Sequence, residues 1–143
     1  MKTIILALAL SLAMLGCTSV RQGITMRAQA PTLDEAFRKF SLALTADGYV
    51  LEVVDPIHHE LLTSGKELKE NERPAGDVSQ AQADESRIAV KMDRRGRLYD
   101  VVVTPMLRYA GGAWIVAGIN HPLREKWQRI VHMLVEKEYR EED

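Results

Sequence analysis

The sequence predicts an α+β domain, in which an antiparallel sheet of about four to six strands carries an N-terminal and a C-terminal amphipathic helix on one face. Three observations lead to this fold. Apolar residues recur at helical spacing in two segments, segments between them alternate apolar with polar residues, and short turn signals separate most of these segments. Packing both helices on one face of the sheet is the simplest way to bury all of these apolar faces.

The first helix is predicted to begin at Thr32. The motif TLDE supplies a capping hydroxyl and, three residues later, an acidic side chain in Glu35. Gly48 suits the left-handed conformation in which many helices end. Between these positions the apolar residues repeat every three or four residues, as on one face of a helix: Leu33, Ala36, Phe37, Phe40, Ala43 and Leu44.

Two short strands are predicted after this helix. Residues 49–54 are rich in β-branched and aromatic side chains and stop at Asp55-Pro56, a turn signal. Residues 60–64 are expected to pair with them as a hairpin. The next segment, 66–84, contains few large apolar residues, so we expect a long flexible loop, either a solvated insertion or a surface that binds a partner.

A second group of strands follows this loop. Residues 86–93 alternate apolar and polar side chains, and residues 98–104 are expected to return beside them as a more buried strand. Pro105 has no amide hydrogen, so we expect the second strand to end, bulge or become an edge there. Residues 106–109 and 114–117 are predicted to form a further hairpin.

The last predicted element is a helix that begins near Pro122, because proline is tolerated in a first helical turn. Its apolar side chains fall on one narrow stripe, and His132 falls on the opposite side. The residues of this stripe are Leu123, Trp127, Ile130 and Leu134, with Val131 beside them.

The N-terminal residues have the order of an export signal. Lys2 precedes an apolar run from Ile4 to Leu15 that only Ser11 interrupts, and Cys17 follows directly after a glycine. A run of about a dozen residues is too short to span the ~30 Å hydrocarbon core of a bilayer as a helix. We therefore expect a cleaved signal rather than a permanent membrane anchor.

At Met14–Cys17 the chain resembles a bacterial lipoprotein. This resemblance implies acylation of the Cys17 sulfur, cleavage just before it, and a mature protein held on a membrane by its acyl chains. Thr18 after the cysteine implies transfer to the outer membrane, on its periplasmic face. The alternative is an ordinary signal in which cleavage falls near Ala28 or Ala30. Since Cys17 is the only cysteine, no disulfide is expected.

The expected organisation is therefore a signal peptide over 1–16, a lipidated N-terminus and tether over 17–31, and a single α+β domain over 32–143. The formal net charge is −1. So balanced a charge gives no reason to expect nucleic acid as a partner. Instead, we expect contact with a membrane through the lipid anchor and with a protein partner in the cell envelope.

Residues 43–65 carry a second resemblance. The run ALTADGYVLEVVDPIHHELLTSG joins a helix ending in Gly-Tyr to a strand, a turn containing aspartate and a strand ending in Thr-Ser. In this order it resembles the helix-grip domains of small envelope lipoproteins, which include the C component of the outer-membrane β-barrel assembly machine. The resemblance implies an interaction role at the outer membrane and supplies no catalytic residues.

The histidines are the first place to look for enzymatic chemistry, and His58-His59-Glu60 is their one dense cluster. Adjacent residues of a strand point to opposite faces, so the two histidines do not easily share a metal unless the turn brings them together. The sequence also lacks the motif G-x-S-x-G of a nucleophilic serine. We therefore expect no catalytic residue, no metal site and no cofactor, and keep a metal-dependent enzyme as a minor alternative.

Four arginines suggest a contact with an anionic group. Arg94, Arg95 and Arg97 crowd one predicted turn, and Arg108 would lie near it if the neighbouring strands align. Guanidinium groups suit phosphate, so lipopolysaccharide or phospholipid headgroups are candidate ligands. The alternative is a soluble turn whose charges protect a strand edge.

Together these patterns predict a lipid-anchored, non-catalytic binding or assembly module. Its candidate contact surfaces are an exposed sheet edge, the loop at 66–84 and the arginine turn. The main alternative, a carrier of a small ligand or lipid, requires a cavity between the helices and the sheet. The bulky side chains of Phe37, Phe40 and Trp127 are expected to fill that space.

Overall fold

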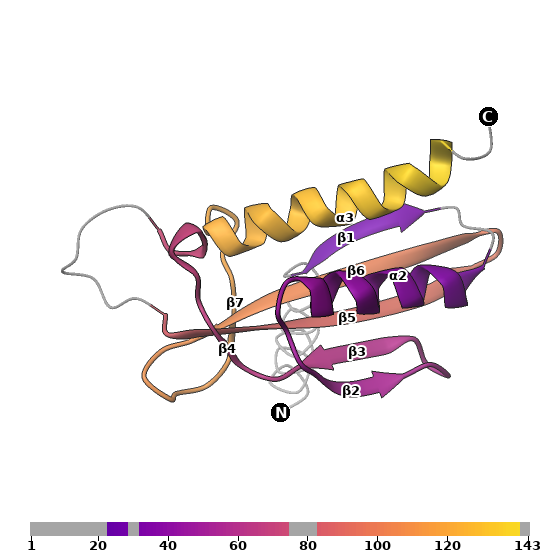
Figure 1. Ribbon diagram of the computed structural model, residues 1–143. Coiled ribbons are helices and arrows are strands. Elements are labelled where there is room, and N and C mark those ends of the chain that lie inside the picture. The colour runs from indigo at the N-terminus through magenta and orange to yellow at the C-terminus, as the bar shows by residue number, and fades with distance from the viewer. Residues whose placement is uncertain (1–22, 29–31, 75–82, 141–143) are drawn as a thin grey trace, which may run out of the picture.

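The computed structural model describes residues 23–28, 32–74 and 83–140. They form an α+β domain with an open, antiparallel sheet of seven strands and two α-helices, so the predicted class is confirmed and the predicted strand number was too low (Figure 1). The elements in chain order are β1 Ile24–Ala28, α2 Leu33–Ala46, β2 Leu51–Asp55, β3 Glu60–Thr63, β4 Lys66–Glu67, the short 3₁₀ helix η2 Glu70–Glu72, β5 Glu85–Arg95, β6 Leu98–Arg108, β7 Ile115–Val116 and α3 Pro122–Arg140.

The sheet has the strand order β1-β6-β5-β3-β2, with β4 paired to β5 and β7 paired to β6. The long β5–β6 hairpin forms its centre, with a continuous register from Arg95 opposite Leu98 to Glu85 opposite Arg108. Strands β1 and β2 form the two edges. Among the described helices, none is long and apolar enough to cross a membrane.

Strand β1 corrects the prediction of a tether over 17–31. Residues Ile24–Ala28 pair with β6, from Ile24 opposite Val103 to Ala28 opposite Tyr99. Only Ile24 is buried here, while Thr25 and Arg27 are exposed. The segment alternates apolar and polar residues as a strand does, but so short a run is a weak signal, and pairing with the backbone of β6 orders it. The domain therefore begins before residue 32.

The predicted flexible loop at 66–84 is also corrected in its first part. Residues 66–74 contain β4 and η2, and both Leu68 and Glu72 are buried. A single leucine and one buried ion pair order this segment, which its polar composition does not reveal. Residues 75–82 lie outside the described part of the chain.

Helix α2 begins and ends at the predicted residues. The hydroxyl of Thr32 accepts a hydrogen bond from the backbone N–H of Glu35 at 3.2 Å. Gly48 follows the helix with φ +90°, in the left-handed region that a side chain disfavours. Helix α3 begins at Pro122, as its position predicts.

Of the outcomes expected at Pro105, the structure shows an edge-like position, because its nitrogen faces away from β5. Strand β6 continues to Arg108, and the carbonyl of Pro105 accepts a hydrogen bond from the Ala117 N–H at 2.9 Å. The carbonyl and nitrogen of one residue point to the same side of an antiparallel strand. On that side the partners in β1 end opposite Val103 and those in β7 begin opposite Met106. Ala117 lies opposite Pro105, and its carbonyl accepts from the Arg124 guanidinium at 3.1 Å in place of the N–H that proline lacks.

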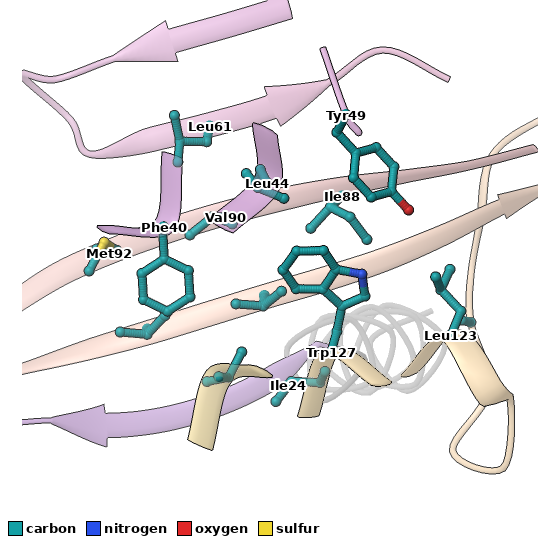
Figure 2. Close-up of a cluster of buried hydrophobic side chains, with 14 of the residues drawn as sticks. Ile24, Phe40, Leu44, Tyr49, Leu61, Ile88, Val90, Met92, Leu123 and Trp127 are labelled. Carbon is teal, nitrogen blue, oxygen red and sulfur yellow. The ribbon is translucent and has the colours of Figure 1, made fainter. Parts of the chain in front are cut away.

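One buried cluster joins both helices to one face of the sheet (Figure 2). Alternate residues of β5 from Ile88 to Met92 and of β6 from Tyr99 to Val103 enter it, because alternate side chains of a strand share a face. The main contributors are Phe40 and Leu44 of α2, Leu123 and Trp127 of α3, Ile88, Val90 and Met92 of β5, and Val101 and Val103 of β6.

Candidate functional site

The site residues predicted from the sequence fall in three places. Cys17 lies outside the described residues, so its acylation stays a prediction. Arg94, Arg95 and Arg97 lie at the β5–β6 turn, as expected. Arg108 does not join them, because it pairs with Glu85 at the opposite end of the same hairpin.

The position of Arg108 corrects the predicted four-arginine cluster. Ten residue steps along β6 separate Leu98, beside the turn, from Arg108, which corresponds to about 30 Å at the usual rise of a strand. The Arg108 guanidinium instead hydrogen-bonds Glu85, with Nε 2.7 Å from Oε2, and lies over the indole ring of Trp114. Sequence alone does not show this, because it leaves the position of Arg108 relative to the turn open.

The charges at the β5–β6 turn are compensated in part, through Asp100. Asp100 accepts from Arg95 at 2.6 Å and from Arg27 at 2.9 Å, so one carboxylate serves two guanidinium groups. Arg94 donates to the Gly96 carbonyl at 3.4 Å. This geometry favours the alternative interpretation, in which the arginines solubilise and protect the turn.

The histidines of the β2–β3 turn lie side by side along a groove of about 610 Å³, but each has its own carboxylate. His58 Nδ1 is 2.7 Å from Asp55 Oδ2, and His59 Nε2 is 2.9 Å from Asp34 Oδ1. The hydrogen bond and charge of Asp55 raise the pKa of His58. Within residues 23–28, 32–74 and 83–140, no group of three or more histidine, cysteine or acidic side chains is placed to hold a metal ion.

His59 is held in an unusual backbone conformation. Its φ of +54° is left-handed, which is uncommon for a residue with a side chain. The imidazole packs edge-on against Phe37, with ring centroids 5.6 Å apart, and the His59 carbonyl accepts from the Met92 N–H at 3.0 Å. These contacts direct the His59 side chain toward α2, and they explain its unusual backbone conformation by packing.

A group of partly and fully buried charges connects both helices to the segment 66–74. Lys126 of α3 donates to Asp47 Oδ1 at 2.8 Å and to Glu72 Oε2 at 3.2 Å. Lys66 Nζ donates to the Asp47 carbonyl at 2.7 Å and lies 4.2 Å from the centre of the Tyr49 ring. Burial alone would raise the pKa of Asp47, but the hydrogen bond and charge of Lys126, with the nearby lysines, lower it. This arrangement positions β4 and η2.

The surface best suited to binding is the edge strand β2. Its neighbour in the sheet is β3, and among the described residues no strand pairs with its outer side (Figure 1). Valine side chains on and beside it are open to solvent: Val50 is 69% exposed, Val53 43% and Val54 51%. We refer to Val50, Val53, Val54 and the outer backbone of β2 as the β2 edge.

The β2 edge has only part of the usual protection of an edge strand: it is five residues long and its pairing with β3 shifts register between Leu51 and Val53. An edge strand leaves a row of N–H and C=O groups without partners, and charged lysines or prolines commonly block it. Strand β2 reads LEVVD and contains neither lysine nor proline. The sequence predicted a strand here but not its place in the sheet, because a run of valines equally suits a central strand.

Comparisons with known proteins leave the chain without an assigned family: no protein-family model matches it, and no curated protein matches its sequence.

Proposed function

We propose that this protein is a lipid-anchored envelope protein that binds a protein partner by accepting one of the partner's strands at the β2 edge. The observation that carries this proposal is the combination of an unpaired outer backbone with three exposed valines on and beside one strand. The lipid anchor is supported by the pattern Met14–Cys17. We assign the domain no catalytic role.

The backbone and side chains of the β2 edge indicate what kind of segment would bind there. An extended segment would gain backbone hydrogen bonds along β2, while its apolar side chains cover the valines. A second copy of this chain is disfavoured, because pairing centred between Val53 and Val54 would set Glu52 of each copy opposite Asp55 of the other. Like charges directly opposite each other destabilise an antiparallel pair.

The alternative function, a carrier of a small ligand or lipid, has less support. Such a carrier needs an apolar cavity between the helices and the sheet. In the described structure Phe40, Leu44 and Trp127 occupy this space, and each is almost completely buried (Figure 2).

The partner proposal is tested by crosslinking in the intact cell. A photo-crosslinking amino acid replaces Val53 in the full-length protein, and a matched variant carries it at Gln128, which is exposed on α3. We expect a discrete crosslinked protein from position 53, and a weak or absent one from position 128. Equal crosslinking from both positions, or none from position 53, would contradict strand addition at the β2 edge.

The anchor is tested separately. Globomycin should block processing of the precursor, and Cys17→Ala should prevent both acylation and maturation. Normal processing in either experiment would overturn the lipid anchor while leaving the crosslinking result intact.

A further inference from the structure

A second apolar surface lies at the opposite side of the sheet, around β7. Ile119 is 79% exposed and Ile115 is 49% exposed. Both line a shallow groove of about 630 Å³, together with Val116, Ala117, Gly118 and Arg124. We refer to Ile115, Ile119 and this groove as the β7 patch. Isolated exposed isoleucines are ordinary, but these two line the same groove.

The β7 patch lies beside the point where the described chain begins. Strands β1 and β7 both pair with β6, in neighbouring stretches of it (Figure 1). Arg124 connects the two, because it donates to the Ala117 carbonyl at 3.1 Å and to the Gly23 carbonyl at 3.4 Å. Gly23 is therefore next to the patch in space.

This position limits how far the patch can lie from a lipid anchor. Six residue steps separate Gly23 from Cys17. Even a fully extended chain of that length reaches only about 20 Å. The longer tether predicted over 17–31 would have allowed a greater distance between the anchor and the domain. Acyl chains on Cys17 would therefore hold the β7 side of the domain close to the bilayer surface.

We propose that the β7 patch docks on the bilayer that carries the protein's own acyl chains, with Ile115 and Ile119 entering the interface. This inference rests on the proposed acylation of Cys17. The anchor keeps the patch close to the bilayer and so raises its effective concentration at the surface. Burial of a small apolar area is then enough for docking. The exposed groups are apolar, so the docking depends little on anionic lipid.

This docking orients the rest of the domain. Four strand spacings separate β1 from β2 in the sheet, which is roughly 19 Å at the usual spacing. The β2 edge then lies on the side of the sheet away from the anchored strand. A partner's strand would reach it without displacing the domain from the membrane.

The test uses the full-length acylated protein in phosphatidylcholine vesicles. Acylation blocks the thiol of Cys17, so Ile119→Cys supplies a single free thiol for an environment-sensitive fluorophore. Lipids with a spin label on the acyl chain should quench its emission about twofold or more. Val53→Cys, labelled in the same way, is the matched control at the opposite edge and should stay unquenched.

Three results would overturn this inference. Quenching at position 119 no greater than at position 53 would exclude insertion, and so would quenching that appears only when phosphatidylglycerol is added. A fluorophore at position 119 that is shielded in cell envelopes but not in pure vesicles would show that a protein covers the patch. Mass spectrometry of the mature N-terminus separates the two proposals: an unacylated chain overturns both, and an acylated chain without quenching overturns only the docking.

Discussion

The two edge strands of the sheet differ in how they are protected. Strand β1 lies beside α3, and its Arg27 forms an ion pair with Asp100 of the neighbouring strand. Strand β2 exposes Val53 and Val54 and pairs with β3 alone among the described strands. A helix lies beside each edge strand, so the difference lies in the exposed side chains, which are Thr25 and Arg27 on β1 and include two valines on β2.

The largest expected effect lies in the core beneath α3, where Trp127 is fully buried. Trp127→Ala should lower the free energy of unfolding by about 3–5 kcal/mol, because it removes a large side chain and leaves a cavity. Val53→Ala at the β2 edge should change it by less than about 0.5 kcal/mol. Urea denaturation followed by circular dichroism measures both, and similar losses would remove the distinction between the two edges.

The charge group that joins α2 to α3 should contribute less. Asp47→Asn should cost about 1–2 kcal/mol near neutral pH, since it weakens partly buried ion pairs with Lys126 and Lys66. The pKa of Asp47 is lower in the folded protein than its ordinary value of 3.8. Its contribution is therefore complete above that value and is lost as the pH falls through the folded-state pKa. Urea midpoints of the two proteins should converge in acid, and a constant difference would argue against this role.

The turn that leads into the open edge should be sensitive to backbone conformation. Gly48→Ala should cost about 1 kcal/mol, because the residue has φ +90°. Gly118→Ala is the matched control, since a Cβ there meets nothing within 4 Å and φ is not positive. Thermal unfolding should separate the two variants, and an unaffected Gly48→Ala protein would contradict the assigned conformation.

The smallest effect is expected at the far end of β2, in the exposed turn. Asp55→Asn removes the carboxylate that raises the pKa of His58, so this pKa should fall toward its ordinary value of 6.5. The favourable pairing is present at low pH and is lost as the pH rises through the folded-state pKa of His58. NMR titration of the imidazole signals measures the shift. His121, whose pKa is lowered by burial at a different site, should titrate as before.

The helices were predictable because their signals are local. Thr32, Gly48 and Pro122 act within one turn of their own helix. Most of the apolar repeat of α2 is buried, as are Leu123, Trp127 and Val131 of α3, while Ile130 and Leu134 are partly buried. The hairpins at Asp55-Pro56 and Arg94–Arg97 were predictable for the same reason, since a turn and its two strands are neighbours in sequence.

The corrections all concern contacts between distant residues. Strand β1 exists because β6 offers it a backbone edge 71 to 79 residues away in sequence, and Pro105 is tolerated because its nitrogen faces away from β5 and Arg124 donates to the opposite Ala117 carbonyl. Arg108 is distant from the arginine turn because the β5–β6 hairpin is long and unbroken. Strand β2, the candidate site, was predictable as a strand. Its position at an edge follows only from the order of the strands in the sheet.

By itself the sequence determined the α+β class, the limits of the two helices and the pattern Met14–Cys17 on which the proposed anchor rests. Capping, turn formation and helical periodicity depend on residues a few positions apart, so they can be recognised in the sequence. Tertiary structure alone decided which strands lie at the edges, which charges find partners, and that Arg124 connects the β7 patch to Gly23. Those outcomes depend on backbone pairing between segments whose order in space no local pattern specifies.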